Sequence, residues 1–245
     1  MLPSTTLTLE EVHLVRCLTK ISQRHFAPGR SVVILSPATY RDVQQELIAE
    51  IQRTAFWPVV VTVDGSISIP VKTDFIDRDG SYIILTPDWK LESIDAQILG
   101  LILDGKNEFT QLWSSDARFV VAGANELSMS QQKDLFDYFS KFRIYNLIIV
   151  SQEHDIKDNK YSRPNKVDDV DTGMKLGVYT WFPYQSSDHC TEVNDITPLD
   201  SWIISAQGHF TKNIDLFPGK FSNSFNWCPM KVLYMTNSGF LLLYM

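Results

Sequence analysis

The chain has 245 residues, of which 44% are hydrophobic and 21% are charged, and its formal net charge is -7 at pH 7. This apolar content is enough for a packed core and excludes a largely disordered chain. The acidic balance, without a visible cluster of lysines and arginines, argues against a nucleic-acid-binding protein.

Helical and strand-like segments alternate along the first 150 residues. The strand-like runs are continuously apolar and rich in Val and Ile, which is typical of parallel strands covered by helices on both faces. In chain order we predict a helix over Thr8–Arg24, a strand over Val32–Leu35, a helix over Tyr40–Thr54, strands over Val59–Val63 and Tyr82–Leu85, a helix over Ser93–Leu103, a strand over Phe119–Ala122, a helix over Ser128–Phe142 and a strand over Leu147–Val150.

Two of these helices have clear amphipathic patterns. Val43, Leu47 and Ile51 recur at helical spacing in the first crossover. Ser128 is a suitable N-cap for the helix before the fifth strand. The alternation predicts an α/β domain with a doubly wound, mostly parallel sheet, either Rossmann-like or flavodoxin-like.

The composition changes after Val150. Glu153–Thr172 is polar and is predicted to be a surface loop. Two apolar segments follow, Leu176–Tyr184 and Trp202–Ser205, and we expect them to return to the same sheet or to lie against its edge. No apolar run approaches the roughly 20 residues that a membrane-spanning helix requires, and Met1–Thr6 shows no signal-peptide pattern.

The expected ligand position in such a sheet is the carboxyl end of its strands. Ser36–Tyr40 follows the first strand without a glycine, so neither a dinucleotide fingerprint nor a P-loop can form there and no nucleotide cofactor is expected. Asp88 and the Asn125–Glu126 pair follow the third and fourth strands. Helix capping explains these residues more simply than ligand binding does.

No complete catalytic or metal-binding group is recognisable. Ser151, Glu153 and His154 are close in sequence, but the glycines of a nucleophile elbow are missing and triad partners normally come from distant segments. Asp168–Asp171 lacks the spacing of a calcium loop. His189 is next to Cys190, and His209 and Cys228 follow downstream, but a solvated histidine and a disulfide explain these residues more economically than a metal site does. We therefore expect a protein that is not an enzyme and binds no metal.

The cysteines and aromatic residues leave alternatives open. Cys17, Cys190 and Cys228 are compatible with one disulfide and a free thiol, or with three reduced thiols. Trp181, Trp202 and neighbouring rings in the last third could line an apolar pocket, although core packing is the simpler interpretation.

The last third also carries an ordered series of segments: Tyr179–Tyr184, Cys190, Leu199–Trp202, Asp215–Lys220 and Asn226–Val232. The series resembles the insect chemosensory ionotropic receptors, a divergent branch of the ionotropic glutamate receptors. Cys17–Leu18 and Ser36–Pro37 also look like the amino-terminal region of that family. The matching motif residues are Trp181, Phe182, Pro183, Tyr184, Trp202, Leu216, Phe217, Pro218, Cys228 and Pro229.

The resemblance implies an extracellular amino-terminal domain in a subunit of a ligand-gated cation channel of sensory-neuron plasma membranes. It implies a Rossmann-like domain over residues 1–206, with an irregular loop over 153–174, and a linker and the start of a truncated ligand-binding lobe over 207–245. Partners would be other subunits of a hetero-oligomer, the rest of the receptor and, in the full-length protein, a small chemosensory molecule.

The resemblance also bears on the cysteines and on the ends of the chain. In an oxidising compartment it favours a disulfide between Cys190 and Cys228, although the sequence has no Asn-x-Ser/Thr glycosylation acceptor. The pore and agonist-binding segments of the family have no counterpart here, and we expect an incomplete gene model rather than a truncated product. The rival classes are a soluble α/β small-molecule-binding protein and a hydrolase-like enzyme.

Overall fold

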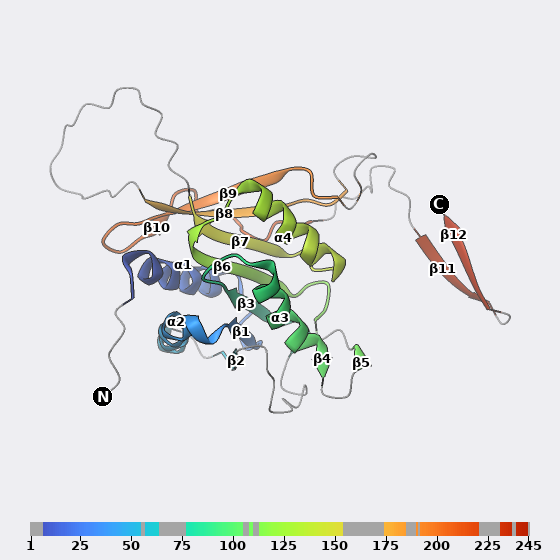
Figure 1. The fold of residues 1–245 in the computed structure, drawn as a ribbon, viewed down its shortest axis with the longest axis horizontal. Helices are drawn as coiled ribbons and strands as arrows, with labels where there is room; N and C mark the ends of the chain where they lie inside the picture. Colours follow the sequence, from blue (N-terminus) through green and yellow to red (C-terminus); the bar gives the residue numbers. More distant parts are fainter. Residues whose placement is uncertain are drawn as a thin grey trace, which may run out of the picture.

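The structure is a computed structural model. It describes residues 7–54, 57–63, 77–104, 108–109, 113–153, 174–184, 190, 192–220, 231–236 and 239–244. An eight-stranded sheet runs through its centre in the order β10-β9-β8-β7-β6-β3-β1-β2 (Figure 1). Its strands are β1 (Val32–Ser36), β2 (Val59–Val63), β3 (Ser81–Leu85), β6 (Arg118–Glu126), β7 (Leu147–Gln152), β8 (Lys175–Trp181), β9 (Ile196–Ile203) and β10 (His209–Phe210).

The first five of these strands in the chain are parallel to one another, and β8, β9 and β10 extend the sheet in antiparallel fashion. The parallel order, β2-β1-β3-β6-β7, is that of a flavodoxin-like sheet, with the order reversing between β1 and β3. The predicted α/β fold class and the return of the later apolar segments to the sheet are therefore confirmed. β9 begins at Ile196, six residues before the predicted start at Trp202. The sequence did not indicate this first half of the strand because it contains Pro198 and polar residues.

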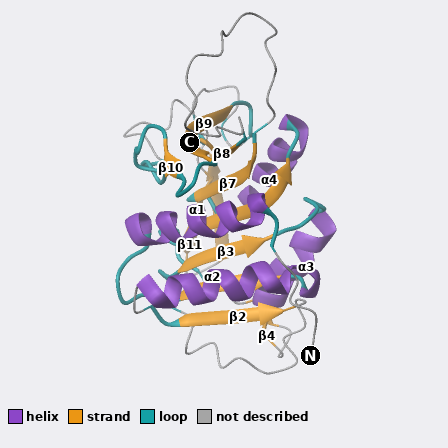
Figure 2. Cartoon of the chain, turned by 90° about the vertical axis from the view of Figure 1, so that its left-hand side faces the viewer, coloured by secondary structure: helices purple, strands orange, loops and turns teal. Residues whose placement is uncertain are grey.

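In the described part of the chain, four helices cover the two faces of the sheet. They are α1 (Leu9–His25), α2 (Arg41–Thr54, preceded by a 3-10 turn over Ala38–Tyr40), α3 (Leu91–Ile102) and α4 (Met129–Lys141). Helices α1 and α2 lie side by side over one face, as Figure 2 shows, and α3 and α4 pack on the other.

Alternation along each strand divides the core into two layers. Val32 and Ile34 of β1 pack with α1 and α2, whereas Val33 and Leu35 belong to the layer under α3 and α4. Both faces of the parallel strands are therefore buried, which explains why these strands are continuously apolar.

Local sequence signals define the helix ends. The predicted N-cap Ser128 is confirmed, because its Oγ accepts from Gln131 N at 3.3 Å while Gln131 Oε1 accepts from Ser128 N. Thr8 and Glu11 form the same capping box at α1. None of the helices in the described part of the chain is both long and apolar enough to cross a membrane.

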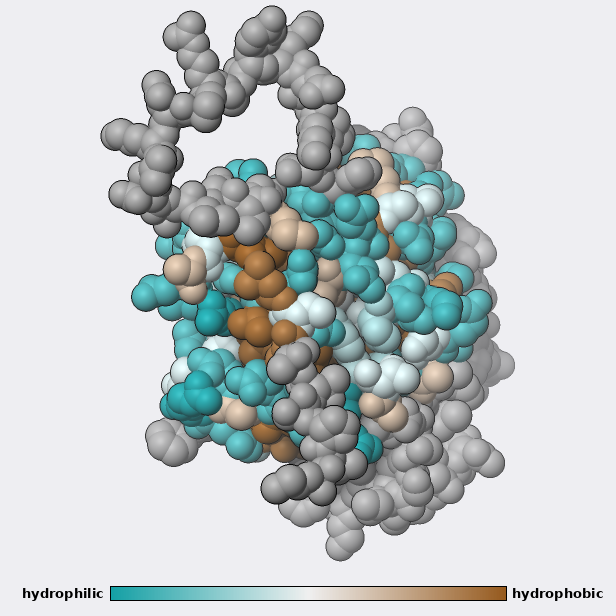
Figure 3. Space-filling model, turned by 60° about the vertical axis from the view of Figure 1, so that its left-hand side comes forward, coloured by the Kyte–Doolittle hydropathy of each residue, from teal (hydrophilic) through white to brown (hydrophobic). Residues whose placement is uncertain are grey.

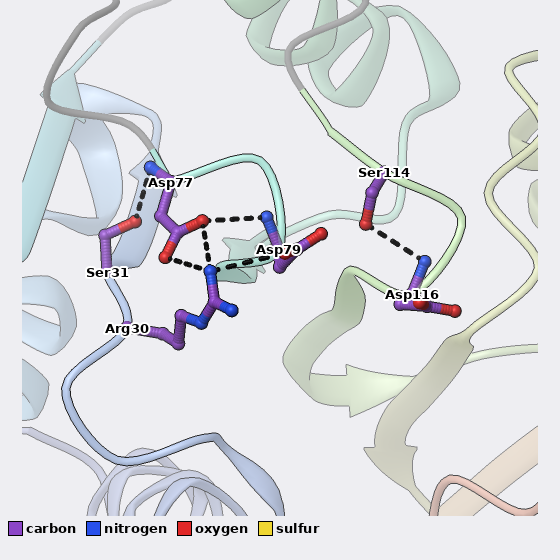
Figure 4. A network of polar contacts seen from close by, with 6 residues as sticks. All are labelled: Arg30, Ser31, Asp77, Asp79, Ser114 and Asp116. Carbon is purple, nitrogen blue, oxygen red and sulfur yellow. Dashed lines mark hydrogen bonds and ion pairs between the residues drawn. The ribbon is translucent and has the colours of Figure 1, made fainter.

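The amino-terminal edge of the sheet is fixed by an ion-pair network (Figure 4). Arg30 Nη1 lies 2.7 Å from Asp77 Oδ2 and 3.2 Å from Asp79 Oδ2, and Ser31 Oγ accepts from Asp77 N at 3.0 Å. A Cβ on Gly80 would lie 2.8 Å from the Ser31 and Asp77 carbonyl oxygens. This network locks the turn into β3, at the edge opposite to the one where ligands bind such sheets.

Two shorter pairs of strands lie outside the main sheet. β4 (Leu103–Asp104) pairs with β5 (Glu108–Phe109), and β11 (Lys231–Thr236) forms an antiparallel hairpin with β12 (Gly239–Tyr244). The described residues 209–220, which the sequence assigned to a linker, pair with β9 or pack on the core through Leu216 and Phe217. That the following segment begins a ligand-binding lobe stays a prediction.

Candidate functional site

Trp89 packs over the carboxyl ends of β3 and β6. This residue has a positive φ of 54°, is 5% exposed and donates from Nε1 to Asn125 O at 3.1 Å. A Cβ on Gly123 would lie 2.8 Å from the indole, so only glycine allows the ring to settle there. The indole therefore packs against the ends of both strands.

The structure does not show the helix-capping roles that were predicted for Asp88 and Asn125. Asn125 does not cap α4, since Ser128 does, and its Nδ2 donates to Pro87 O instead. Asp88 pairs with Lys90 at 2.9 Å and accepts from its backbone N–H. Both side chains hold the loop that carries Trp89.

A groove lies at the carboxyl ends of β6 and β7. Its volume is about 730 Å³, and β8, β9 and the first turn of α4 complete its walls. Register shifts in the β6–β7 and β8–β9 pairings border it, and such bulges commonly redirect side chains beside functional sites. The lining residues are Glu126, Leu127, Ser128, Met129, Gln131, Gln132, Gln152, Glu153, Tyr179, Ile196 and Pro198.

The polar part of this groove is acidic. Glu153 Oε2 accepts from Ser201 Oγ at 3.4 Å, and the Glu153 backbone N–H donates to Lys175 O. Burial, together with the negative charge of Glu153, raises the pKa of Tyr179 to about 12, so its hydroxyl stays protonated. The Tyr179 ring crosses Gly177, where a Cβ would lie 2.3 Å from the phenol oxygen.

The remainder of the lining is amide and apolar. Gln132 Nε2 donates to Leu127 O, whereas Met129 is 74% exposed at the rim. Carboxylates, amides and an apolar rim can hold a small molecule that offers hydrogen-bond donors or a positive charge beside an apolar body. They provide no activated nucleophile.

The hydrolase alternative gains no support from the described residues. Ser151 is fully buried at the end of β7, and its Oγ has no hydrogen-bond partner and therefore no base beside it. His154 lies outside the described residues. No group of three or more potential metal ligands occurs in the described ranges, and Asp168–Asp171, His189 and Cys228 lie outside them.

The motif aromatics pack on opposite faces of the sheet. Trp181 is 1% exposed and contacts Phe136 under α4, with ring centroids 6.4 Å apart. Trp202 lies under α1, where its Nε1 donates to His13 Nδ1 at 3.3 Å and its ring meets Phe210 edge-on. Core packing, the simpler of the two interpretations, is what these rings do. A shared aromatic pocket is not formed by Trp181 and Trp202.

The other motif residues of the described part extend this packing. Pro183, Leu216 and Phe217 are buried, while Phe182, Tyr184 and Pro218 are partly buried. Pro229 and Cys228 lie outside the described residues. Cys190 is disulfide-bonded and Cys17 is a buried free thiol, so the pairing of Cys190 with Cys228 stays a prediction.

Two buried charged residues were not recognised individually from the sequence. Asp200 Oδ1 accepts from Thr211 Oγ1 at 2.7 Å and from the backbone N–H of Lys212 at 2.9 Å, and its Oδ2 accepts from Asn213 N at 2.7 Å. Lys220, 4% exposed, donates from Nζ to Trp181 O and to Thr180 Oγ1. Their only sequence signal was their position inside the motif segments.

Comparison with known proteins adds no assignment to this geometry. No protein-family model matches the chain, and a search of curated proteins gives no match.

Proposed function

We propose that this chain is the amino-terminal extracellular domain of a chemosensory ionotropic receptor subunit, with a binding and assembly role in a ligand-gated cation channel. It acts without catalysis and contacts other subunits and the remainder of its own receptor. The small chemosensory ligand belongs to the full-length protein.

The observation that carries the proposal is the mutual packing of the motif segments. Lys220 donates to the carbonyl of Trp181 across 39 positions of sequence, at 2.7 Å. Asp200 organises the turn that leads from β10 toward Leu216. The described segments of the ordered series, Tyr179–Tyr184, Leu199–Trp202 and Asp215–Lys220, are thus connected to one another on the antiparallel half of the sheet, and this supports the proposal.

The lining of the groove also supports a non-catalytic domain. Trp89 packs over the ends of β3 and β6, and the groove offers carboxylates and amides without a nucleophile and base in contact. Such surfaces suit binding more than bond cleavage.

The test is the sequence of the transcript downstream of Met245. The proposal expects a second α/β lobe interrupted by apolar spans of about 20 residues. Co-precipitation of the full-length product with co-expressed receptor subunits should then succeed. An in-frame stop codon after Met245 in every transcript would contradict the proposal.

A second candidate, a free-standing small-molecule-binding protein, is favoured by the groove of about 730 Å³. Under that candidate the 245-residue chain itself binds a small amine or polyol, and Glu153→Gln removes the binding. Binding by the isolated chain, combined with the stop codon, would select this candidate over the receptor domain.

A further inference from the structure

The exposed face of α1 carries three cations in one row. Arg16, Lys20 and Arg24 are spaced by four residues, so they project from the same face over about 12 Å of helix. All three are exposed, while Val15, Leu18 and the other inward residues are buried. The spacing of four is the sequence signal, but it escapes a search for consecutive basic residues.

This row forms one wall of a groove of about 450 Å³. The opposite wall is the turn between β9 and β10, where Arg16 Nη1 donates to Ala206 O at 3.0 Å and the Arg24 guanidinium lies 5.7 Å from the Phe210 ring centroid. Gly208 has a φ of 71° and lies against Trp202, where a side chain cannot fit. The two arginines are thereby held in place along a preformed groove.

The cations of this row form no ion pair within the described part of the chain. The ion pairs of the described residues include none of Arg16, Lys20 and Arg24. Glu50, the acidic residue that lines the groove, is paired with Arg53. Like charges four residues apart destabilise a helix, and this row contains two such pairs.

Alternative explanations cover only part of the row. A cation in the last turn of a helix is stabilised by the helix dipole, which accounts for Arg24. Arg16 and Lys20 lie too far from the end for that effect. The chain has 29 acidic and 22 basic residues, so its composition does not favour an unneutralised basic row.

We propose that this groove is a binding site for a small polyanion of the phosphate or carboxylate class. Guanidinium groups bind both anions through paired N–H donors, and the ammonium group of Lys20 adds a mobile point charge between them. The site lies on the α1 face of the sheet, whereas the acidic groove lies at the first turn of α4. It does not depend on the receptor proposal.

The experiment is calorimetric titration of the 245-residue chain with pyrophosphate and, separately, with citrate at low ionic strength. Saturable binding of at least one probe is expected. Lys20→Glu should weaken it by at least about ten-fold, because one attractive contact becomes repulsive. Lys133→Glu on α4 makes the same charge change on the other face and should leave the affinity within about two-fold.

The two probes separate the anion chemistry: binding of pyrophosphate alone identifies a phosphate site, and binding of citrate alone a carboxylate site. Lys20 forms no hydrogen bond or ion pair with the residues that the structure describes, so thermal unfolding of Lys20→Glu should match that of Lys133→Glu. Absence of saturable binding to both probes overturns the proposal. Equal weakening by the two variants also overturns it, since the effect would then be net charge alone.

Discussion

The ammonium group of Lys220 lies 4.6 Å from the centroid of the Phe182 ring. It also donates to Trp181 O and Thr180 Oγ1, and Thr180 Oγ1 in turn donates to Leu147 O at 2.8 Å. This chain of contacts fastens the segment after β10 onto β8 and β7. The ring and the carbonyl stabilise the cation only partly, and burial lowers the pKa of Lys220 to about 7.

The lowered pKa predicts a specific pH dependence of stability. Between about pH 7 and the ordinary lysine pKa of about 10.4, the unfolded chain holds a proton on Lys220 that the folded chain does not. The free energy of unfolding should therefore rise with pH through this window. Below it, Lys220 should contribute no pH dependence, and Lys220→Met should remove the rise.

Melting temperatures of wild type and Lys220→Met, measured from about pH 6 to pH 10, test this prediction. Groups that titrate in both proteins cancel in the difference. A difference in melting temperature that does not change between pH 7 and pH 10 would mean that Lys220 is charged in the folded protein.

Asp200 should be a strong determinant of stability. Burial alone would raise its pKa, but hydrogen bonds from Thr211, Lys212, Ser201 and Asn213 outweigh this and lower it. Asp200→Ala should cost about 2–4 kcal/mol, because backbone N–H groups lose a charged acceptor. Thr211→Val, which removes one donor only, should cost about 1 kcal/mol.

Urea unfolding of these two variants gives the comparison. Because the folded pKa lies below the unfolded one, the contribution of Asp200 is present above the unfolded pKa and is lost as the pH falls through the folded value. The gap between wild type and Asp200→Ala should therefore narrow in acid. Equal costs for the two variants would show that the carboxylate does not organise the turn.

Gly208 and Gly29 allow steric contact to be separated from backbone strain. Both have positive φ, 71° and 79°, but a Cβ on Gly208 would lie 2.3 Å from Trp202 whereas one on Gly29 meets nothing within 4 Å. Gly29→Ala should cost about 1 kcal/mol from strain alone. Gly208→Ala should lower the free energy of unfolding, measured by chemical denaturation, clearly more than Gly29→Ala does. An equal loss in the two variants would show that Trp202 does not pack against Gly208.

The sequence predicts the core of this fold well, because burial is written directly in residue type. The runs around Ile34, Ile84 and Val121 are apolar on both faces, and each became a central parallel strand. Ser128 was recognisable as a cap because capping requires only a local hydrogen bond. Such signals involve neighbours in sequence and need no tertiary information.

The candidate groove could not be predicted in the same way. Glu153 and Tyr179 line the same groove because β8 folds back antiparallel to β7, and nothing near either residue in the sequence indicates that pairing. Asn125 was predicted to cap a helix, but its side-chain amide donates to the carbonyl oxygen of Pro87, which follows a different strand. Pro198 argued against a strand at the start of β9, because proline is rare inside a sheet. The structure accommodates it at the register shift beside Tyr179.

The acidic groove gives a final prediction, on the pKa of Tyr179. Burial is the largest cause of its rise to about 12, and the charge of Glu153 adds to it. Glu153→Gln removes that charge and should lower the pKa of Tyr179 without returning it to the ordinary tyrosine value of about 10. Loss of burial through unfolding of β9 would also lower this pKa. Near-ultraviolet circular dichroism of Glu153→Gln should therefore be unchanged, which shows that the ring stays in place.

Titration of the 13C-labelled tyrosine ring carbons by NMR measures this pKa, with Tyr179→Phe identifying the resonance. Glu46→Gln on α2 is the matched control, since it removes one negative charge on the other face of the sheet and should leave the pKa of Tyr179 unchanged. The same variants then serve for ligand binding. A Tyr179 that titrates identically in wild type and Glu153→Gln would show that the carboxylate points away from the groove, and a cationic ligand would lose its principal partner there.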